Sequence, residues 1–274
     1  MDLTEKPSSA PPKARLPLAV TTNGVVPPEV VQRARQAARA WGLPYVDRRR
    51  KAPLWPLLEK VAEAFLVFSK VDVVLWDGEG SLGFQPGIAH LRVKRLDAGV
   101  WDEDTFLRVT ELRDGESVLD CTLGLAQDGL VAARAVGPSG RVVGLEKSLA
   151  LYAVMSEGLN AYDFGPRSSR IEVRHEDAGD FLRKQPTGSF DVVVFDPMFE
   201  RPAKAQPSFE VLRRFADHTP LTPEILGEAR RVARRLVAVK ASKHSEDFAR
   251  LGLTPVPLSR YASVAWARVP ALGG

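Results

Sequence analysis

The sequence has few of the residues that mark several other classes of protein. A single cysteine, Cys121, stands among 274 residues, which excludes an internal disulfide framework and fits a reducing compartment. No apolar run approaches the ~20 residues needed to cross a bilayer. We therefore expect a cytoplasmic protein with no membrane partner. We also predict no metal site, because the four histidines lack metal-ligand spacing: His90, His175, His218 and His244.

Length and charge set wide limits on organisation and partners. The chain is long enough for one large domain or two modest ones. A formal net charge of +4 permits an anionic partner such as RNA without requiring one. Residues 1–15 are polar, lack the apolar stretch of a secretory signal and are predicted to form a flexible tail.

Residues 16–95 are predicted to form a small α/β domain with a possible role in substrate recognition. Residues 16–22 are β-prone, and a helix is expected after Pro28, with Val30, Ala34 and Ala37 on its apolar face. A second helix is expected near Trp55, and residues 67–76 are strand-like. A break at residues 95–100 predicts the boundary with a second domain, 96–274.

Two basic segments in this first part each allow two interpretations. The cations at positions 48–51 repel one another, so they form either a solvated loop or a phosphate-contacting patch. In residues 88–94, Leu91 and Val93 alternate with basic residues, which predicts a strand with one basic edge. That edge faces either solvent or a substrate.

Residues 118–129 resemble the opening unit of a nucleotide-binding domain. A short apolar run ends in Asp120, passes through a turn centred on Gly124 and enters a helical pattern. Gly124 has no Cβ, so a ligand can approach the backbone closely. The three-glycine fingerprint is incomplete, with Thr122 and Ala126 at two of its positions, and a purely structural turn remains an alternative.

Acidic residues follow the next two strands of the predicted sheet. Glu146 ends the strand after the glycine turn, where its carboxylate can accept hydrogen bonds from both hydroxyls of a ribose. A 2′-phosphate would be repelled there, which argues against NADP. Asp177 follows the third strand and either contacts an adenine amine or only caps the next helix.

The tetrapeptide Asp196-Pro197-Met198-Phe199 follows a nearly continuous apolar strand, residues 191–195. The Asp196 carboxylate and the Pro197 carbonyl can both accept hydrogen bonds from one planar amine. Phe199 can stack on a flat base, an interaction worth ~1–3 kcal/mol. A proline-terminated strand with Phe199 in the core would leave the charged Asp196 unexplained.

Together these features resemble the class I S-adenosylmethionine methyltransferases, which implies an α/β fold with a Rossmann-like seven-stranded domain. Residues 120–129 and 195–199 look like the bacterial family of small-subunit ribosomal RNA guanine-N2 methyltransferases and its uncharacterised relatives. Residues 87–92 look like the segment just before that family's core. The resemblance covers residues 87–240, and the N-terminal part looks like the extension of the less-studied relatives.

The resemblance implies S-adenosylmethionine as cofactor and RNA as partner. The residues it places at the cofactor are Asp120, Thr122, Leu123, Gly124, Leu125, Glu146, Lys147, Asp177, Ala178 and Asp196. The residues to which it assigns a catalytic role are Asp196, Pro197 and Phe199. Those expected at the substrate are His90, Arg92, Met198, Phe199 and Lys240.

The sequence departs from the family pattern at two positions, Ala126 and Met198. Ala126 replaces a glycine of the ribosomal RNA enzymes, which puts cofactor affinity in question. Met198 replaces the second proline common in adenine and DNA enzymes, which favours a guanine-N2 target. We therefore predict methyl transfer to an exocyclic amine of ribosomal RNA.

Several alternatives differ from this prediction in what they require. A carbon-5 cytosine enzyme would need a cysteine nucleophile, whereas Pro197 is followed by Met198. A small-molecule or protein methyltransferase would share the fold without needing the tetrapeptide. A catalytically idle RNA-binding module would keep the basic segments and lose cofactor affinity. An NAD-dependent oxidoreductase lacks support because the spaced glycines are missing.

Overall fold

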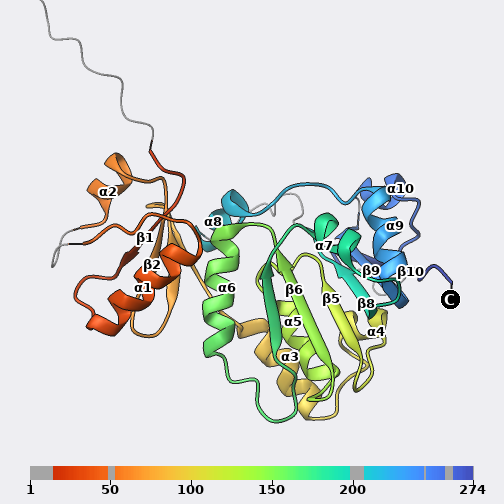
Figure 1. Cartoon of the computed structure of the whole chain (residues 1–274). Coiled ribbons are helices and arrows are strands. Elements are labelled where there is room, and N and C mark those ends of the chain that lie inside the picture. The colour runs from red at the N-terminus through yellow and green to blue at the C-terminus, as the bar shows by residue number, and fades with distance from the viewer. Residues whose placement is uncertain (1–14, 49–52, 198–206, 244, 257–261, 274) are drawn as a thin grey trace, which may run out of the picture.

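Two sheets lie side by side in the computed structural model, which describes residues 15–48, 53–197, 207–243, 245–256 and 262–273. Figure 1 shows the smaller, N-terminal sheet at the left and the larger sheet with its covering helices at the right. Helices α6 (Leu149–Ala161) and α8 (Pro207–Phe215) contact strands of the smaller sheet. The predicted α/β class with a Rossmann-like domain is confirmed.

The smaller sheet has the strand order β1-β2-β3-β4, and only the first pair of strands is parallel. Residues 67–76, predicted as one extended stretch, instead belong to a hairpin. The Ser69 hydroxyl accepts hydrogen bonds from the backbone amides of Val71 and Asp72, which closes its turn. The elements of this part are β1 (Ala19–Thr22), α1 (Pro28–Ala40), α2 (Trp55–Lys60), β2 (Phe65–Phe68), β3 (Val73–Trp76) and β4 (Ser81–Gly83).

The strand predicted over residues 88–94 is wrong, because this segment is helix α3 (Gly87–Asp97). Its buried residues, Ala89 and Leu96, are seven apart, as expected for one face of a helix lying on helix α5 (Gln127–Ala135). Successive helical residues rotate by about 100°, so His90 and Arg92 lie on nearly opposite sides rather than on one edge. His90 is exposed and Arg92 is partly buried.

Helix α3 contacts the larger unit through α5, whereas β4 ends the smaller sheet at Gly83. We propose that the boundary between the two units lies at residues 84–86, ahead of the predicted 95–100. The packing of α3 on α5 carries this proposal.

The larger sheet has the strand order β10-β9-β8-β5-β6-β7 and is parallel except for β10. Within the described residues it has six strands rather than the predicted seven. The segment at residues 253–256 contributes an isolated bridge between Pro255 and Ala267, and residues 257–261 lie outside the described chain. The strands are β5 (Ser117–Asp120), β6 (Arg141–Glu146), β7 (Ile171–His175), β8 (Phe190–Phe195), β9 (Ala233–Ser242) and β10 (Val264–Pro270).

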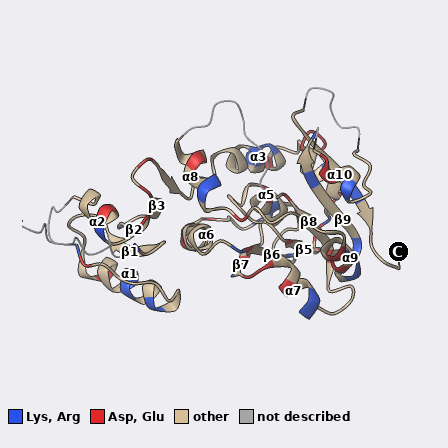
Figure 2. Cartoon of the chain, turned by 90° about the horizontal axis from the view of Figure 1, so that it is seen from above, with Lys and Arg blue, Asp and Glu red and all other residues tan. Residues whose placement is uncertain are grey.

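Alternating strand residues build a core on each face of this sheet. In β8, Val192 and Val194 belong to the cluster with α5 and α6, whereas Val193 and Phe195 belong to the cluster with helices of the other face. Figure 2 shows α3 and α5 on one side of the strands and α7 on the other. The remaining helices are α4 (Thr105–Thr110), α7 (Ala178–Lys184), α9 (Pro223–Val232) and α10 (Asp247–Arg250).

Two helical glycines predict opposite effects of the same substitution. A Cβ at Gly158, in α6, would lie 2.2 Å from Cβ and Cγ of Phe84, whereas Gly227, in α9, has open space around it. Gly158→Ala should therefore cost about 1–3 kcal/mol through overpacking. Gly227→Ala should add up to about 1 kcal/mol through helix propensity. Calorimetric melting should show a lower Tm for the first variant and a higher one for the second. Equal shifts would contradict the packing of Phe84 on α6.

Candidate active site

A cleft enclosing about 770 Å³ of solvent-open space lies where the parallel strands of the larger sheet end. The carboxyl ends of β5, β6, β7 and β8 all contribute to it. Ligands of open α/β sheets bind at this edge, near the point where the chain order reverses between β5 and β8. The lining includes Cys121, Thr122, Gly124, Glu146, Lys147, Asp177, Ala178, Gly179, Asp196, Pro197, Ala216, Asp217, Thr219, Leu221 and Ile225.

The turn after β5 has two residues in the left-handed backbone region. Gly124 has φ +50°, and its amide donates a hydrogen bond to Oε2 of Glu146 at 3.1 Å. Ala126, the residue before α5, has φ +57°, a conformation that costs a residue with a Cβ about 1–2 kcal/mol. Ala126 stands where the ribosomal RNA enzymes have a glycine, and a glycine at this position would relieve the backbone strain.

Glu146 lies on the floor of the cleft and is only 7% exposed. Its Oε1 accepts a hydrogen bond from the amide of Ser148 at 2.8 Å, while Oε2 accepts the one from Gly124. Burial raises the pKa of Glu146 to about 7, against the opposing effect of these amides. The two amides orient the carboxylate and leave its remaining lone pairs for a ligand.

Asp120 lies beneath the turn and outside the cleft lining, 5% exposed. Its carboxylate accepts a hydrogen bond from the Thr122 amide at 3.1 Å. Burial raises the pKa of Asp120 to about 7, and the carboxylates of Asp128, Asp196 and Glu146 add to this rise. The contact with Thr122 fits a structural role in shaping the turn.

The buried Asp120 predicts a stability that depends on pH. Its folded-state pKa of about 7 exceeds the unfolded value near 3.8, so the folded protein holds more protons between these values. Its contribution to stability is therefore fully present below about pH 4 and is lost as pH rises through about 7. Asp120→Asn should raise Tm clearly at pH 8 and change it little at pH 4. Melting curves at the two pH values test this.

Asp191 provides a control, because its replacement is expected to change Tm in the opposite direction. Although burial opposes it, the Ser117 hydroxyl and amide and the Arg234 guanidinium lower the pKa of Asp191. Asp191→Asn should therefore lower Tm at pH 8. If Asp120→Asn has the same Tm as the wild type at pH 8, then burial does not raise the pKa of Asp120.

Lys147 joins two acidic residues that line the cleft. Its Nζ lies 3.2 Å from Oδ2 of Asp177 and 3.4 Å from Oδ2 of Asp217, and it donates to the Thr219 hydroxyl at 3.1 Å. The other oxygen of Asp177 caps α7 by accepting from the Asp180 amide at 3.1 Å. Although burial opposes it, this amide and Lys147 lower the pKa of Asp177. Asp177 is thus a helix cap and also a cleft residue.

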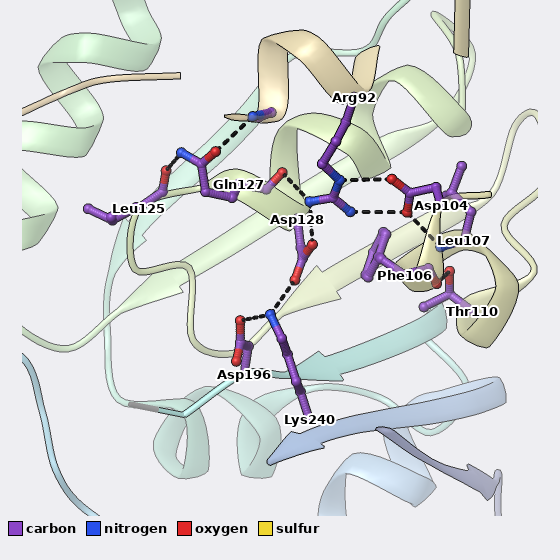
Figure 3. Close-up of polar contacts among 11 residues, drawn as sticks. Arg92, Asp104, Phe106, Leu107, Thr110, Leu125, Gln127, Asp128, Asp196 and Lys240 are labelled. Carbon is purple, nitrogen blue, oxygen red and sulfur yellow. Dashed lines mark hydrogen bonds and ion pairs between the residues drawn. The ribbon is translucent and has the colours of Figure 1, made fainter. Parts of the chain in front are cut away.

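Asp196 follows β8 and is fixed at both its backbone and its side chain. Its amide donates to the Thr122 hydroxyl at 2.6 Å, which ties the end of β8 to the glycine turn. Its Oδ2 accepts from Nζ of Lys240, in β9, at 2.7 Å (Figure 3). Burial raises the pKa of Asp196 to about 6, although Lys240 opposes the rise. The carboxyl is thus ionised at neutral pH.

A chain of ion pairs extends from Asp196 to the helices on one face of the sheet (Figure 3). Nζ of Lys240 lies 3.3 Å from Oδ2 of Asp128, and Nη1 of Arg92 lies 2.7 Å from Oδ1 of Asp128. Nε and Nη2 of Arg92 bind the two oxygens of Asp104 at 2.8 and 3.0 Å. Acids and bases alternate along the chain, so each cation has a carboxylate on both sides.

The structure separates the predicted site residues into groups. Leu123 is buried, with its side chain against Gly144, and Leu125 is partly buried outside the cleft lining. His90 is exposed on α3, and neither Arg92 nor Lys240 lines the cleft. Met198 and Phe199 lie outside the described residues. Those that line the cleft are Thr122, Gly124, Glu146, Lys147, Asp177, Ala178, Asp196 and Pro197.

Sequence reasoning missed Asp128, Asp104 and Asp217. Asp128 lies in the first turn of α5, where an acid is common for helix-dipole reasons alone. Asp104 is the N-cap of α4, and its side chain also accepts from the Leu107 amide. Asp217 precedes α9 in a loop. Their roles depend on partners distant in sequence, such as Lys240, 112 residues after Asp128.

The strand order, the cleft and the acid that ends β6 agree with the fold expected of a class I S-adenosylmethionine-dependent methyltransferase. Residues 85–252 match the family described as "Putative SAM-dependent methyltransferase", which is more than half of the chain. The chain belongs to this family, and S-adenosylmethionine is its cofactor.

Three relatives show how far the similarity extends. YpiP of Bacillus subtilis (strain 168) is 32% identical over 239 residues, 85% of this chain and 92% of that protein. Ribosomal RNA small subunit methyltransferase J of Laribacter hongkongensis (strain HLHK9) is 33% identical over 130 residues, 45% of each chain. The crystal structure of a SAM-dependent methyltransferase from Neisseria gonorrhoeae has a TM-score of 0.59 at 19% identity, covering 93% of this chain and 97% of that one. The last comparison supports the fold.

The residues of the cleft fit the cofactor. A Cβ at Gly124 would meet only the Thr122 carbonyl, at 3.7 Å, so a ligand has room beside the turn. Glu146 supplies a carboxylate that neutral hydroxyls can bind. None of the helices in the described part of the chain is long and apolar enough to span a membrane. Among the same residues, no three His, Cys, Asp or Glu side chains group as a metal site would require.

Proposed function

We propose that this methyltransferase acts on an exocyclic amine of small-subunit ribosomal RNA, specifically N2 of guanine. The observation that carries the proposal is the Asp196 carboxylate, which lies at the end of β8 on the wall of the cofactor cleft. The partial similarity to ribosomal RNA small subunit methyltransferase J supports the RNA substrate. Such a substrate would place the protein in the cytoplasm.

The cofactor-binding roles follow from the positions around the cleft. Glu146 would accept hydrogen bonds from the ribose hydroxyls. The turn at residues 122–125 would hold the methionine part, with Asp120 shaping the turn from below. Asp177 would accept a hydrogen bond from the adenine amine, Lys147 would keep Asp177 in place, and the adenine ring would lie near Ala178.

The Asp196-Pro197 pair would activate the acceptor amine. The lone pair of an aromatic amine is delocalised into its ring, so the amine is a poor nucleophile. The Asp196 carboxylate and the Pro197 carbonyl would accept its two hydrogens, turn its lone pair toward the cleft and stabilise the positive charge that develops on nitrogen. When bound, S-adenosylmethionine supplies the methyl group as an electrophilic sulfonium substituent.

The acceptor base must leave any helix that contains it or come from a single-stranded region. Phe199 would stack on the base and Met198 would lie beside it, as the motif predicts. The basic residues at positions 48–51, of which 49–51 lie outside the described residues, would contact the RNA backbone together with the exposed His90. A small molecule or a protein remains the alternative acceptor.

A panel of acceptors tests the proposal. Protein and methyl-labelled S-adenosylmethionine should be incubated with deproteinised small-subunit RNA, assembled small subunits, a bulk protein extract and a set of small amines. We expect label in RNA, as deproteinised RNA or within the subunit. Label confined to the protein or the small amines would support the alternative acceptors and overturn the RNA assignment.

A further inference from the structure

Lys240 has an unusual position for a residue first expected to contact the substrate. It lies in β9 beside the end of β8, and its ammonium is shared between Asp196, at 2.7 Å, and Asp128, at 3.3 Å. The same Nζ lies 5.3 Å from the ring centroid of Trp266, in β10. Only a fifth of the Lys240 side chain is exposed. Its charge is therefore already matched within the protein.

The contact with Lys240 makes the two oxygens of Asp196 unequal. Oδ2 accepts from Lys240, whereas among the contacts of the described residues Oδ1 accepts no hydrogen bond. The Asp196 backbone is held independently by the Thr122 hydroxyl. With the backbone and one oxygen fixed, the carboxylate has little freedom to rotate.

We propose that Lys240 is a positioning residue that binds one oxygen of Asp196 and so presents the other to the acceptor amine. This inference rests on the proposed function of Asp196. Asp128 binds the same ammonium through its Oδ2, and Arg92 in turn holds Asp128 through its Oδ1. In this arrangement Lys240 acts through Asp196 and makes no contact with the substrate.

Lys240 also keeps Asp196 ionised. Four charged groups on the surrounding elements act on this carboxyl: Lys240 from β9, Asp128 from α5, Arg92 from α3 and Asp120 from β5. Burial raises the pKa of Asp196 most, the Asp128 carboxylate adds to the rise, and the two cations lower it, Lys240 more than Arg92. Without Lys240, burial and the neighbouring acids would favour the protonated carboxyl, which has lost acceptor capacity.

The test compares Lys240→Met, which keeps the length of the side chain without its charge, with Lys240→Arg, which keeps the charge. The matched control is Lys184→Met, because Lys184 is exposed and pairs with Glu176 on the surface. Two quantities are measured as a function of pH. One is the titration of Asp196, followed by NMR of carboxyl-labelled aspartate and assigned with Asp196→Asn. The other is kcat for methyl transfer to small-subunit RNA.

In Lys240→Met the pKa of Asp196 should rise by about 1–3 units, the range for a carboxylate that loses an adjacent cation. The acid limb of the kcat profile should move to higher pH by the same amount. Because the wild-type pKa is about 6, kcat at pH 7 should fall about twofold for a rise of one unit and about 100-fold for a rise of three. Lys240→Arg should restore both to near wild type, and Lys184→Met should change neither. The Kd of S-adenosylmethionine should stay within about threefold, because Lys240 does not line the cofactor cleft.

Two results would overturn the inference. One is an Asp196 titration that is the same in Lys240→Met and wild type. The other is a shifted titration with an unmoved rate profile in an active enzyme. Absence of transfer by the wild type to any RNA would overturn the proposed function and the positioning role with it. The NMR titration needs no substrate. It therefore tests the ion pair between Lys240 and Asp196 separately from the proposal that RNA is the substrate.

Discussion

Asp196→Ala should lower kcat for methyl transfer by on the order of 10²–10³-fold, the usual effect of removing a group that stabilises developing charge. The Kd of S-adenosylmethionine should change only a few-fold, because the ribose, adenine and methionine contacts are assigned to other residues. Asp196→Asn keeps one acceptor oxygen and should lose less. Single-turnover transfer and calorimetric titration measure the two quantities separately.

The matched control for this prediction is Asp102→Ala, which removes an exposed carboxylate away from the cleft. It should leave both quantities unchanged. Equal losses of transfer rate and cofactor affinity in Asp196→Ala would mean that Asp196 binds the cofactor and does not orient an amine.

Glu146→Ala should weaken S-adenosylmethionine binding by on the order of 10–100-fold, as expected when hydrogen bonds to a charged acceptor are lost. The substitution also leaves the amides of Gly124 and Ser148 without their acceptor, which loosens the turn. Glu146→Gln keeps an acceptor for one amide and should weaken binding less. Titration calorimetry of the variants tests this, and wild-type affinity in Glu146→Ala would remove Glu146 from the cofactor site.

The same residue gives cofactor binding a pH dependence. Because the pKa of Glu146 is about 7 in the protein alone, much of the carboxyl is protonated below that pH. The ionised form is the better acceptor for ribose hydroxyls, so the Kd should fall as pH rises through about 7 and level off above it. Glu146→Gln should show a weaker dependence over this range.

The order of acids and turns in the sequence was enough to predict that these residues line one cleft. Parallel strands end at one edge of a sheet, so Glu146, Asp177 and Asp196, each at or just past the end of a strand, had to lie near the turn at Gly124. The hydrophobic periodicity of the sequence and the direction of the strands suffice for this prediction. It does not depend on side-chain partners.

The segment at residues 88–94 shows where periodicity alone fails. Alternation over a few residues fits a strand, yet Ala89 and Leu96 also lie on one face of a helix. Packing against α5 decides between the two, and that contact is tertiary. The hairpin at Ser69 was missed for a related reason, since a hydroxyl closes its turn and no glycine or proline marks it.

The ion-pair chain behind Asp196 could not be predicted because its members are far apart in sequence. Asp128 lies 36 residues after Arg92 and 112 residues before Lys240. The family resemblance places Arg92 and Lys240 at the substrate. In the folded chain, both cations form ion pairs with carboxylates of the protein itself.

The most direct test of the central claim is the identity of the methylated nucleoside. Small-subunit RNA should be incubated with the protein and methyl-labelled S-adenosylmethionine, digested to nucleosides and analysed by mass spectrometry. The assignment of Asp196 and Pro197 predicts labelled N2-methylguanosine in the wild-type reaction and its loss with Asp196→Ala. Label on a ring carbon or a ribose oxygen would contradict it, because neither acceptor has an exocyclic amine for this pair to orient.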